Sequence, residues 1–304
     1  MDYKKIIKNR NTRFLILKLL GFVPDSIMLK LQYRIKLGRS LDLKHPKRFT
    51  EKLQWYKINY RNPIMHQCVD KYGVRKYVES KGLGDILVKL YGHYKTINDV
   101  PFSALPNSFV IKTTHGGGGL NVVVVPDKSK LNTDELKQKL SFNEEKVANN
   151  GGGREWAYYG LKTGIIVEQL LVNNENPKAG VNDYKIFCYN GHAKYIIVDV
   201  DRYIGHKRNF YDREWNNLHI TSDCSAVDRE IERPEKLDEM LEIAEKLSEK
   251  FPFVRVDLYC VDEKIYFGEL TFYPWSGYVQ FTPDKWDFTF GEGFELKKYI
   301  KVKR

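Results

Sequence analysis

Two carboxylates near the end of the chain have a spacing that can bind a metal ion. The segments 253–260 (FVRVDLYC) and 264–272 (KIYFGELTF) both alternate polar with apolar residues, a pattern that predicts a β-hairpin with one buried face. In that hairpin we expect Asp257 to face Glu269. Carboxylates opposed in this way have Cβ atoms about 5 Å apart and repel each other. A divalent cation that prefers oxygen ligands, such as Mg²⁺, would offset the repulsion.

This pairing depends on the length of the turn between the two segments. A three-residue turn at 262–264 pairs Val261 with Ile265, and the resulting register brings Arg255 and Thr271 to the same face as the carboxylates. A two-residue turn would shift the register by one and place the carboxylates on opposite faces. Arg255 alone could also offset part of the repulsion, which would make this face a surface ion-pair patch. The other face is predicted to pack in the core with Val254, Val256, Leu258, Leu270 and Phe272.

A second candidate site is a glycine-rich loop that could enclose phosphate groups. In the segment 109–119 (FVIKTTHGGGG), a predicted strand that carries Lys112 runs into His115 and four glycines. Successive backbone N–H groups without side chains can close around phosphates, and the lysine adds a positive charge. No Lys-Ser or Lys-Thr pair follows the glycines, so the loop is not a Walker P-loop. Taken alone, such a loop is equally typical of a flexible connector; its glycines are Gly116, Gly117, Gly118 and Gly119.

These residues need a framework of strands and helices, and the hydrophobic periodicity predicts both. Asn190-Gly191 separates two apolar runs within 184–200, and this dipeptide is preferred in two-residue hairpin turns. Shorter buried runs predict strands at 109–112, 121–125 and 164–171, and helical patterns cover 1–60, 66–82, 133–148 and 234–250. Because helices are mixed with antiparallel hairpins, we predict an α+β or mixed α/β fold.

The positive charge of the chain is concentrated at its N-terminus. The 304 residues carry a formal charge of +11, and residues 1–60 alone contain 15 Lys or Arg against 4 Asp or Glu. Such a segment suits an anionic partner, such as a membrane surface, an acidic polymer or nucleic acid; the alternative is a solvated basic face without a partner. Residues 14–23 (FLILKLLGFV) predict a basic amphipathic helix that either rests on a membrane or packs on the main domain. The run is shorter than the roughly 20 apolar residues that a membrane-spanning helix needs.

The cysteines indicate a reducing compartment. Cys68, Cys188, Cys224 and Cys260 lie far apart and form no C-x-x-C pair, so a zinc site is not indicated. In a chain of this length, such cysteines are typical of reduced and mostly buried thiols. We therefore expect a cytoplasmic protein.

The order of the motifs resembles that of the ATP-grasp superfamily, and within it the teichuronopeptide-biosynthesis (TupA-like) branch. The resemblance covers about residues 45–295. It rests on FVIKTTHGGGG, on the paired segments VRVDLY and FGELTFYP, and on HPKRFTEKLQW (45–55), DKYGVR (70–75), IIVEQLL (165–171), DYKIFCYNG (183–191) and HKRNFYDREW (206–215). The segment 45–55 is similar to the N-terminal signature of the branch, and its residues reveal no chemistry by themselves.

The resemblance implies a nucleotide site. Lys71, Lys112 and the glycine loop from His115 to Gly119 would contact the phosphates of ATP. The adenine would lie against the hinge residues, which are Glu168, Gln169, Leu170 and Leu171.

It also implies a metal and transfer site. Lys185 and Arg208 would act on the phosphates or on the reaction intermediate, and Arg255 would stabilise the transferring phosphoryl group. Mg²⁺, with two ions expected, would bind Asp257, Glu269 and Thr271. Thr271 stands where most ATP-grasp enzymes have Asn, and this weakens its claim as a ligand because a hydroxyl coordinates less well than an amide oxygen.

The implied fold is the ATP-grasp fold, in which two α+β lobes grip ATP. We expect a basic helical segment at 1–60 and a catalytic domain at 61–304, with a glycine-loop lid lobe at about 85–165 and a hinge and metal-binding lobe at about 166–295. The implied reaction joins a carboxylate to an amine through an acyl phosphate and releases ADP and phosphate. The TupA-like branch further implies that an amino acid or amine is joined to the uronic-acid carboxyl of a saccharide. The setting would be bacterial surface-polysaccharide biosynthesis, whether capsular, O-antigen or teichuronic.

Two other classes of protein stay open at this point. Asp199-Val200-Asp201 mimics the D-x-D metal motif of glycosyltransferases, although it lies in a predicted hairpin strand and leaves the glycine loop unexplained. A basic membrane- or nucleic-acid-binding protein would need aromatic stacking platforms among its basic residues, and Tyr33, Trp55 and Tyr56 are few and helical. We therefore expect a cytoplasmic ligase that does not bind nucleic acid and that can contact the inner face of the plasma membrane through residues 1–60.

Overall fold

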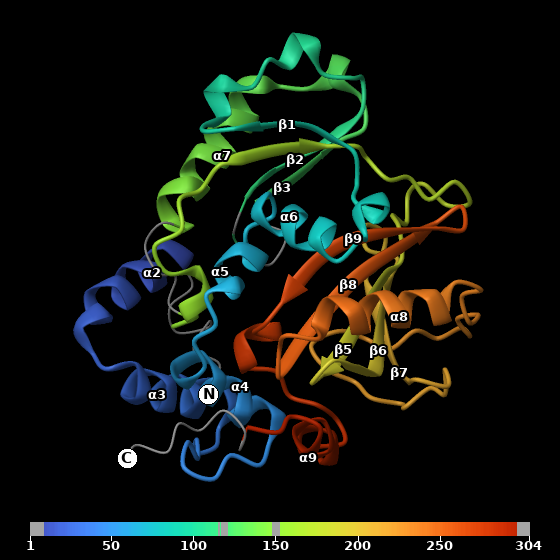
Figure 1. Cartoon of the computed structure of the whole chain (residues 1–304). Coiled ribbons are helices and arrows are strands. Elements are labelled where there is room, and N and C mark those ends of the chain that lie inside the picture. Colours follow the sequence, from blue (N-terminus) through green and yellow to red (C-terminus); the bar gives the residue numbers. More distant parts are fainter. Residues whose placement is uncertain (1–8, 115, 117–120, 148–152, 297–304) are drawn as a thin grey trace.

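Two antiparallel sheets form the framework of the molecule (Figure 1). The computed structural model describes residues 9–114, 116, 121–147 and 153–296. The smaller sheet has four strands in the order β1-β4-β2-β3, and the larger sheet has five in the order β7-β6-β5-β8-β9. Helices pack on this framework, which confirms the mixed α+β class predicted from the sequence.

Each strand and helix predicted from the sequence patterns is present, with the differences described below, and the structure adds strands at 90–94 and 207–212 and a helix at 285–292 that those patterns did not predict. The strands are β1 (Leu90–Tyr94), β2 (Phe109–Thr113), β3 (Val122–Val125), β4 (Ile165–Glu168), β5 (Asp183–Tyr189), β6 (His192–Val200), β7 (Lys207–Asp212), β8 (Phe253–Val261) and β9 (Lys264–Thr271). The helices are α2 (Arg10–Leu19), α3 (Asp25–Leu37), α4 (Phe49–Asn59), α5 (Ile64–Val69), α6 (Gly73–Ser80), α7 (Thr133–Val147), α8 (Leu237–Ser248) and α9 (Lys285–Glu292). A short 3₁₀ turn, η7 (Pro274–Gly277), follows β9 closely.

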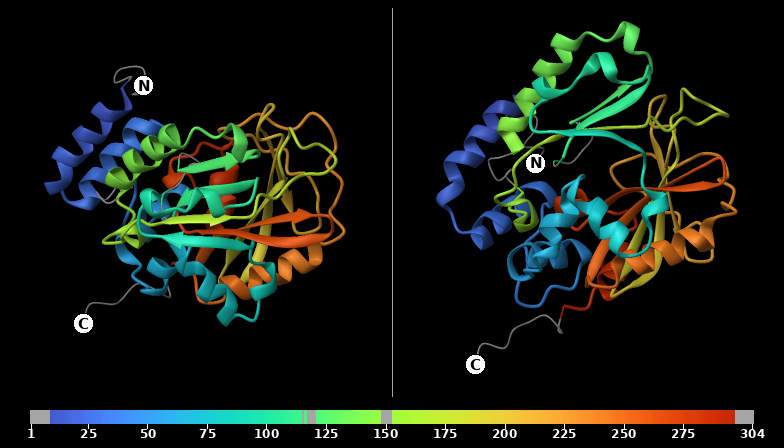
Figure 2. Two further views of the ribbon diagram at one scale, coloured as in Figure 1. Left: turned by 90° about the horizontal axis from the view of Figure 1, so that it is seen from above. Right: turned by 45° about the horizontal axis from the view of Figure 1, so that its top comes forward.

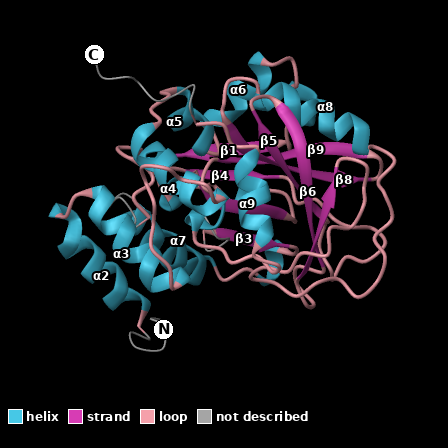
Figure 3. Ribbon diagram, turned by 90° about the horizontal axis from the view of Figure 1, so that it is seen from below, coloured by secondary structure: helices cyan, strands magenta, loops and turns pink. Residues whose placement is uncertain are grey.

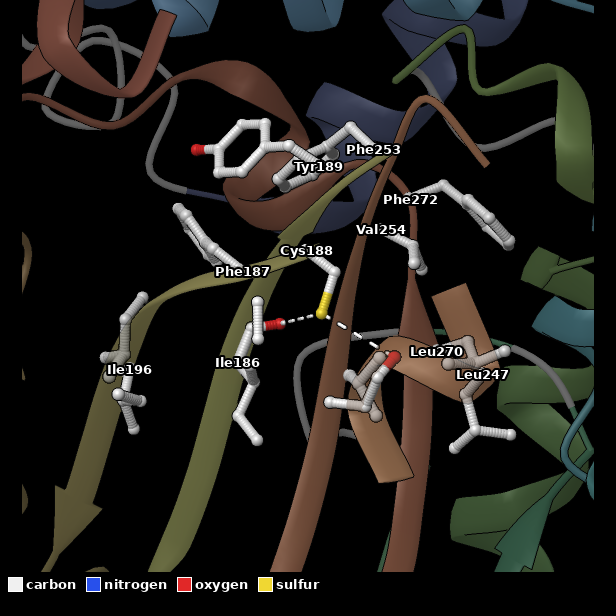
Figure 4. Close-up of a cluster of buried hydrophobic side chains, with 14 of the residues drawn as sticks. Ile186, Phe187, Cys188, Tyr189, Ile196, Leu247, Phe253, Val254, Leu270 and Phe272 are labelled. Atoms are coloured by element: carbon white, nitrogen blue, oxygen red, sulfur yellow. Dashed lines mark hydrogen bonds between the residues drawn. The ribbon is translucent and has the colours of Figure 1, made fainter. Parts of the chain in front are cut away.

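The larger sheet buries one of its faces against α8. Cys188 of β5 and Val254 of β8 lie on this face, close to Leu247 of α8 (Figure 4). The Cys188 Sγ atom is 3.7 Å from the carbonyl oxygen of Ala244 in α8, and like the other three cysteines it is a free thiol. The predicted Asn190-Gly191 turn joins β5 to β6, and both of its residues have positive φ, as a two-residue hairpin turn requires. Since side chains alternate along a strand, the residues between the core-facing positions point to the other side of the sheet.

The smaller sheet and α7 form a separate lobe, seen at the top of Figure 1 and of the right-hand view in Figure 2. Its own hydrophobic core includes Phe109 and Ile111 of β2, Val167 of β4 and Leu140 of α7. All residues of β4 are buried because this strand lies between β1 and β2.

The turn between β8 and β9 differs from the predicted one. It has two residues, Asp262 and Glu263, which both have positive φ, and it pairs Val261 with Lys264. The predicted three-residue turn was therefore wrong. Asp262 and Glu263 adopt the left-handed backbone conformation that two-residue hairpin turns require, although neither is glycine. This turn alone would place the two carboxylates on opposite faces of the hairpin.

A β-bulge at Gly268 restores the expected pairing. The partner of Leu258 is Phe267 and the partner of Asp257 is Glu269, so Gly268 is the extra residue in β9. Beyond the bulge, Arg255 pairs with Thr271. The predicted partners are thus correct, although the turn that was expected to align them is not. The predicted core face is also confirmed, since all of its members are buried: Val254, Val256, Leu258, Leu270 and Phe272.

The helix predicted over 66–82 is interrupted. α5 ends at Val69, and α6 begins only at Gly73. Between them, the Asp70 carboxylate accepts hydrogen bonds from the backbone N–H groups of Tyr72 and Gly73, at 3.1 and 2.6 Å. A side chain that binds the nearby backbone in this way competes with helical hydrogen bonds and ends the helix.

Two other elements are shorter than predicted. β4 ends at Glu168, so the remainder of 164–171 lies outside the strand. α8 begins at Leu237, because the N–H of this residue closes a turn on the carbonyl oxygen of Pro234 before the helix starts.

The helices of the basic N-terminal segment pack in two different places. α4 belongs to the main core, where Phe49, Leu53 and Tyr56 are buried. α3 buries Leu29 and Tyr33 in a smaller cluster. Helices α2 and α3 lie on the outside of the molecule, on the side opposite α8 (Figures 1 and 3). Within the described ranges, none of the helices combines the length and the apolar character that crossing a membrane requires.

Candidate active site

Charged side chains occupy one part of the face of the larger sheet that points away from α8, and Phe187 on the same face packs against Phe49 of α4. The strand register places Lys185 beside Asp257, and Asp183 beside Asp199. Lys185 lies close to all three of these carboxylates, and its positive charge offsets part of the cost of burying them. The buried members of this polar face are Asp183, Lys185, Asp199, Arg208, Arg255 and Asp257, and Glu269 lies at its more exposed edge.

Arg255 lies at the centre of the predicted metal site. Its Nη2 atom is 2.7 Å from Asp257 Oδ2, 3.1 Å from Glu269 Oε1 and 3.1 Å from Thr271 Oγ1. Its Nε atom donates to Asp257 Oδ1 at 2.6 Å, so the arginine and the aspartate form a bidentate pair. The Thr271 hydroxyl donates to Glu269 Oε1 at 2.9 Å. The three oxygen atoms expected to bind Mg²⁺ thus converge around one guanidinium nitrogen.

The two opposed carboxylates have different protonation properties. Burial raises the pKa of Asp257 to about 6, although the charges of Arg255 and Lys185 act in the opposite direction. Burial also disfavours the ionised form of Glu269, but Arg255, Lys71 and Lys185 outweigh it and lower the pKa of Glu269 to about 2. Positive side chains therefore already offset the repulsion that the sequence predicted between these two groups.

Lys185 connects Asp257 to a second acidic pair. Its Nζ atom contacts the Asp183 carboxylate and lies 3.2 Å from Asp257 Oδ2 and 3.7 Å from Asp199 Oδ2. Burial acts to lower the pKa of Lys185, but Asp183 and Asp257 raise it above its ordinary value. The Oδ1 atom of Asp183 is buried without a hydrogen-bond partner among the described residues. One acceptor oxygen on this face is therefore left for a ligand.

Arg208 forms the other end of the polar face. Its Nε and Nη2 atoms bind the two oxygens of Asp199 at 2.6 and 3.0 Å, and its Nη1 atom donates to Asp223 Oδ1 at 2.6 Å. The Trp275 indole N–H donates to the same Asp223 oxygen at 2.9 Å, and the guanidinium carbon lies 5.2 Å from the centre of the indole ring. Burial opposes the ionisation of both Arg208 and Asp199, but their hydrogen bonds and mutual attraction raise the pKa of Arg208 and lower that of Asp199. The arginine is thus held in one orientation beside an aromatic ring.

Glu168, which the resemblance places in the hinge, forms ion pairs with two cations. Lys112 of β2 lies 2.6 Å from Glu168 Oε2, and Arg75 of α6 donates to Glu168 Oε1 at 3.1 Å. Gln169, the residue after the strand, donates its backbone N–H to the carbonyl oxygen of Lys89. Lys112 and the hinge, which the resemblance assigned to one nucleotide site, are therefore in direct contact.

Lys71 contacts Gly116 and feels the charge of Glu269 on β9. Its backbone N–H donates to the carbonyl oxygen of Thr114 at 2.5 Å, and its Nζ atom donates to that of Gly116 at 2.9 Å. Burial lowers the pKa of Lys71; the charge of Glu269 raises it, and that of Lys112 lowers it further. Lys71 is therefore within electrostatic reach of both groups. The other residues of the predicted phosphate loop, which are His115, Gly117, Gly118 and Gly119, lie outside the described residues.

The donor atoms fit Mg²⁺ that arrives together with phosphate groups. Among the described residues, no cluster of three or more Asp, Glu, His or Cys side chains is arranged to hold a metal ion. Asp257, Glu269 and Thr271 supply two carboxylates and a hydroxyl, and Mg²⁺ is usually held by one or two carboxylates plus the phosphates of a substrate. Because these oxygens converge on the Arg255 Nη2 atom, a cation would compete with the guanidinium group for them.

Helix α4 holds the turn that carries Trp275. Trp275 and Ser276 have φ of 50° and 53°, a left-handed conformation that non-glycine residues seldom adopt. Gln54 Nε2 donates to the carbonyl oxygens of Ser276 and Gly277 at 3.1 and 2.9 Å. Lys57 Nζ donates to the carbonyl oxygen of Ser276 at 2.8 Å and to its hydroxyl at 3.0 Å. Gln54 belongs to the N-terminal signature, which therefore supports a strained turn at the edge of the polar face.

The two aspartates of the D-x-D segment are both bound by arginines. Arg208 binds both oxygens of Asp199, and Arg229 donates to the oxygens of Asp201 at 2.8 and 3.2 Å. These ion pairs give the glycosyltransferase interpretation no support.

Sequence reasoning missed several of these residues. Asp183 had a usable signal, because it lies two positions before Lys185 in a predicted strand and so shares its face. Asp223 and Trp275 lie outside the regular strands and helices, and no spacing in the sequence predicts that they meet at Arg208.

Comparison with known proteins places this arrangement in context. The family described as TupA-like ATPgrasp matches residues 51–295. No curated protein matches the chain.

Several solved structures are similar in fold. A D-alanine–D-alanine ligase from Bacillus anthracis is 21% identical, with a TM-score of 0.40, over 67% of this chain and 57% of that one. An L-amino acid ligase from Bacillus licheniformis is 17% identical, with a TM-score of 0.45, over 75% of this chain and 49% of that one. An N5-carboxyaminoimidazole ribonucleotide synthetase in its ADP complex is 16% identical, with a TM-score of 0.42, over 73% and 50%. The chain thus spans about half the length of these solved structures.

Proposed function

Because the chain belongs to the TupA-like ATP-grasp family, we propose that it is a Mg-ATP-dependent ligase that joins a carboxylate to an amine. The carboxylate of one substrate attacks the γ-phosphate of ATP, which gives an acyl phosphate and ADP. The amine of the second substrate then attacks the acyl carbon, loses a proton and displaces phosphate, so that an amide bond remains. The observation that carries the proposal is the convergence of the Asp257, Glu269 and Thr271 oxygens around Arg255 Nη2.

The proposed nucleotide site lies between the two lobes. Lys112, Lys71 and the glycine loop bind the phosphates, and the hinge residues from Glu168 to Leu171 bind the adenine. The contact of Lys71 with Gly116 and the ion pair of Lys112 with Glu168 support this assignment. The smaller lobe, at about 85–165, acts as a lid that excludes water from the acyl phosphate.

The larger lobe, at about 166–295, supplies the charges for phosphoryl transfer. Negative charge builds up on the phosphoryl oxygens in the transition state, and fixed positive groups stabilise it. We assign this role to Arg255 and Lys185, with Arg208 positioned for the phosphate or the acyl intermediate. Bound Mg²⁺, for which we propose two ions, would neutralise phosphate charge. Its ligands would be Asp257 and Glu269, with Thr271 as the weaker third.

For the substrates, we propose an amino acid or amine and the uronic-acid carboxyl of a saccharide in bacterial surface-polysaccharide biosynthesis. The support is the TupA-like family together with the chemistry at the edge of the polar face. There, Arg208 pairs with Asp223 beside the Trp275 ring and Arg202 pairs with Asp183, and we propose that these two arginines bind the substrate carboxylate. We further propose that the protein works in the cytoplasm, at the inner face of the plasma membrane.

Isothermal titration calorimetry tests the nucleotide assignment. We expect Mg-ATP to bind, and we expect Lys112→Met to weaken this binding at least about tenfold, since one phosphate charge pair is lost. Binding of a UDP-sugar without any affinity for Mg-ATP would contradict the ligase assignment.

A second experiment tests the reaction itself. Release of ADP should depend on both an amine and a carboxylate, so a matrix of amino acids against uronic acids identifies the substrates. ADP release that stays at background for every pair, from a protein that binds Mg-ATP, would argue against the proposed substrate classes and leave the nucleotide site intact.

A further inference from the structure

The N-terminal helices expose large apolar side chains in a regular pattern. Eleven large hydrophobic side chains are exposed among the described residues, and six of them lie between residues 15 and 35, with exposed fractions from 40% to 84%. Residues four apart lie on the same face of a helix. The exposed side chains follow this spacing on both helices and include the connecting turn: Leu15 and Leu19 on α2, Phe22 in the turn, and Ile27, Leu31 and Ile35 on α3. We call these six residues the N-terminal apolar stripe.

Helix α3 is apolar on its inner face as well. There it buries Leu29, Tyr33 and Leu37 against Leu41. The outer row of Ile27, Leu31 and Ile35 therefore lies opposite a face that is already packed, and no described residue covers it. The outer face of α3 has the composition of a contact surface, whereas single exposed apolar residues would need no such explanation.

The charges around the stripe are positive. Lys30 and Arg34 are exposed on α3 and border the stripe, because Lys30 lies three residues after Ile27 and Arg34 three residues after Leu31. The acidic residue at the start of α3, Asp25, is paired with Arg154 at 2.7 Å. The first 60 residues as a whole carry 15 basic and 4 acidic side chains. An apolar helix face bordered by Lys and Arg is typical of a helix that lies in the interface of an anionic membrane.

We propose that the N-terminal apolar stripe, with Lys30 and Arg34 beside it, docks this protein onto the surface of an anionic lipid bilayer. The helices would lie flat, with Ile27, Leu31 and Ile35 inserted at the level of the lipid headgroups. A second copy of the chain suits this face less well, because a symmetric contact would bring two strongly basic segments together.

The stripe is connected firmly to the rest of the protein. Arg154, which follows the smaller lobe's helix α7 in the chain, donates to the carbonyl oxygen of Leu20 at 2.8 Å and binds Asp25 at 2.7 Å. Helices α2 and α3 lie on the outside of the molecule (Figures 1 and 3), so a flat surface can approach them. Docking would therefore hold the whole enzyme at the membrane.

Vesicle flotation with the full chain tests the proposal. The probes are vesicles of phosphatidylcholine mixed with phosphatidylglycerol, and vesicles of phosphatidylcholine alone. We expect the wild type to float with the anionic vesicles and to be released by salt. Since each basic residue contributes roughly fivefold to binding, Lys30→Gln/Arg34→Gln should weaken it about 30-fold. Ile27→Ser/Leu31→Ser/Ile35→Ser should weaken it on the order of 100-fold or more.

The matched control is Ile204→Ser, which removes a side chain that is 56% exposed but lies outside the N-terminal helices. It should float like the wild type. Flotation of the triple variant at the wild-type level, or no flotation of the wild type with anionic vesicles, would overturn the proposal. So would a wild-type dimer that the triple variant converts to a monomer, since the stripe would then join two copies. Flotation requires no nucleotide, so its result does not depend on the proposed ligase activity.

Discussion

Asp257 and Glu269 face each other across β8 and β9 because Gly268 bulges out of β9 between the two-residue turn and the carboxylates. The turn sets a register that is wrong by one residue for a shared site, and the bulge corrects it. The alignment of the two carboxylates thus depends on Gly268, a residue without a side chain.

Gly268→Ala should therefore damage both stability and activity. An alanine Cβ at this position would lie 2.9 Å from the carbonyl oxygen of Asp257 and 3.1 Å from the Tyr259 ring, so the hairpin must shift. We expect the free energy of unfolding to fall by about 1–3 kcal/mol and ADP release to fall with it, because Glu269 moves. Gly84→Ala is the control, since the nearest atom to its Cβ is 3.8 Å away. Normal ADP release from the Gly268 variant would show that the register does not matter.

Neutralising Asp257 should lower the free energy of unfolding more than neutralising Glu269. Asp257→Asn leaves Arg255 and Lys185 without their main buried counter-charge, so we expect it to lower the free energy of unfolding by about 3–5 kcal/mol. The Glu269 side chain is 44% exposed, so Glu269→Gln should cost less than about 1 kcal/mol.

Both substitutions should nevertheless lower ADP release by about 100-fold or more, because each removes one of the two charged ligands that we propose for Mg²⁺. Urea denaturation and an ADP assay on the same two proteins separate the effects. If the stable Glu269→Gln variant turned over at the wild-type rate, the metal assignment would be withdrawn.

Lys57 should make stability depend on pH above neutrality. Burial lowers its pKa from the ordinary 10.5 to about 7, with Glu155 opposing the shift. Between these two values the unfolded chain binds a proton that the folded chain does not, so the free energy of unfolding rises with pH. The slope is at most about 1.4 kcal/mol per pH unit, and the contribution is constant below pH 7. Urea denaturation of the wild type and of Lys57→Met from pH 6 to 10 measures this contribution. If the free energies of unfolding of the two proteins changed with pH in parallel, the prediction would be wrong.

Two arginines that each bind an aspartate through two guanidinium nitrogens allow a comparison. Arg208 is buried on the polar face and binds Asp199, whereas Arg229 is 58% exposed and binds Asp201. Lysine cannot reproduce a bidentate guanidinium contact. Arg208→Lys should therefore lower ADP release by about tenfold or more and cost about 1.5–3 kcal/mol of stability. Arg229→Lys should change stability by no more than about 0.5 kcal/mol. If Arg229→Lys lost activity instead, the D-x-D segment, to which Arg229 binds, would be favoured as part of the active site.

Much of the polar face could be predicted from local sequence patterns. Alternation along 253–260 and 264–272 predicted that Arg255 and Asp257 share a face, because the side-chain period of a strand is two. The Asn190-Gly191 pair predicted the hairpin that presents Lys185. Such features depend only on neighbouring residues and on the backbone geometry that they prefer. The same alternation pointed to a cation between Asp257 and Glu269, whereas the roles of Lys185, Arg208 and Arg255 at a nucleotide site came from the family resemblance.

What the sequence determined by itself was therefore the strands, their buried faces and the residue types on the polar face. Only the tertiary structure decided that Arg255 joins the two carboxylates and that the bulge at Gly268 aligns them. It also brought Gln54 of α4 to the carbonyl oxygen of Ser276, which lies 222 residues further along the chain. Contacts between such distant segments depend on how whole helices and sheets pack, and a periodic pattern within one segment carries no information about that packing.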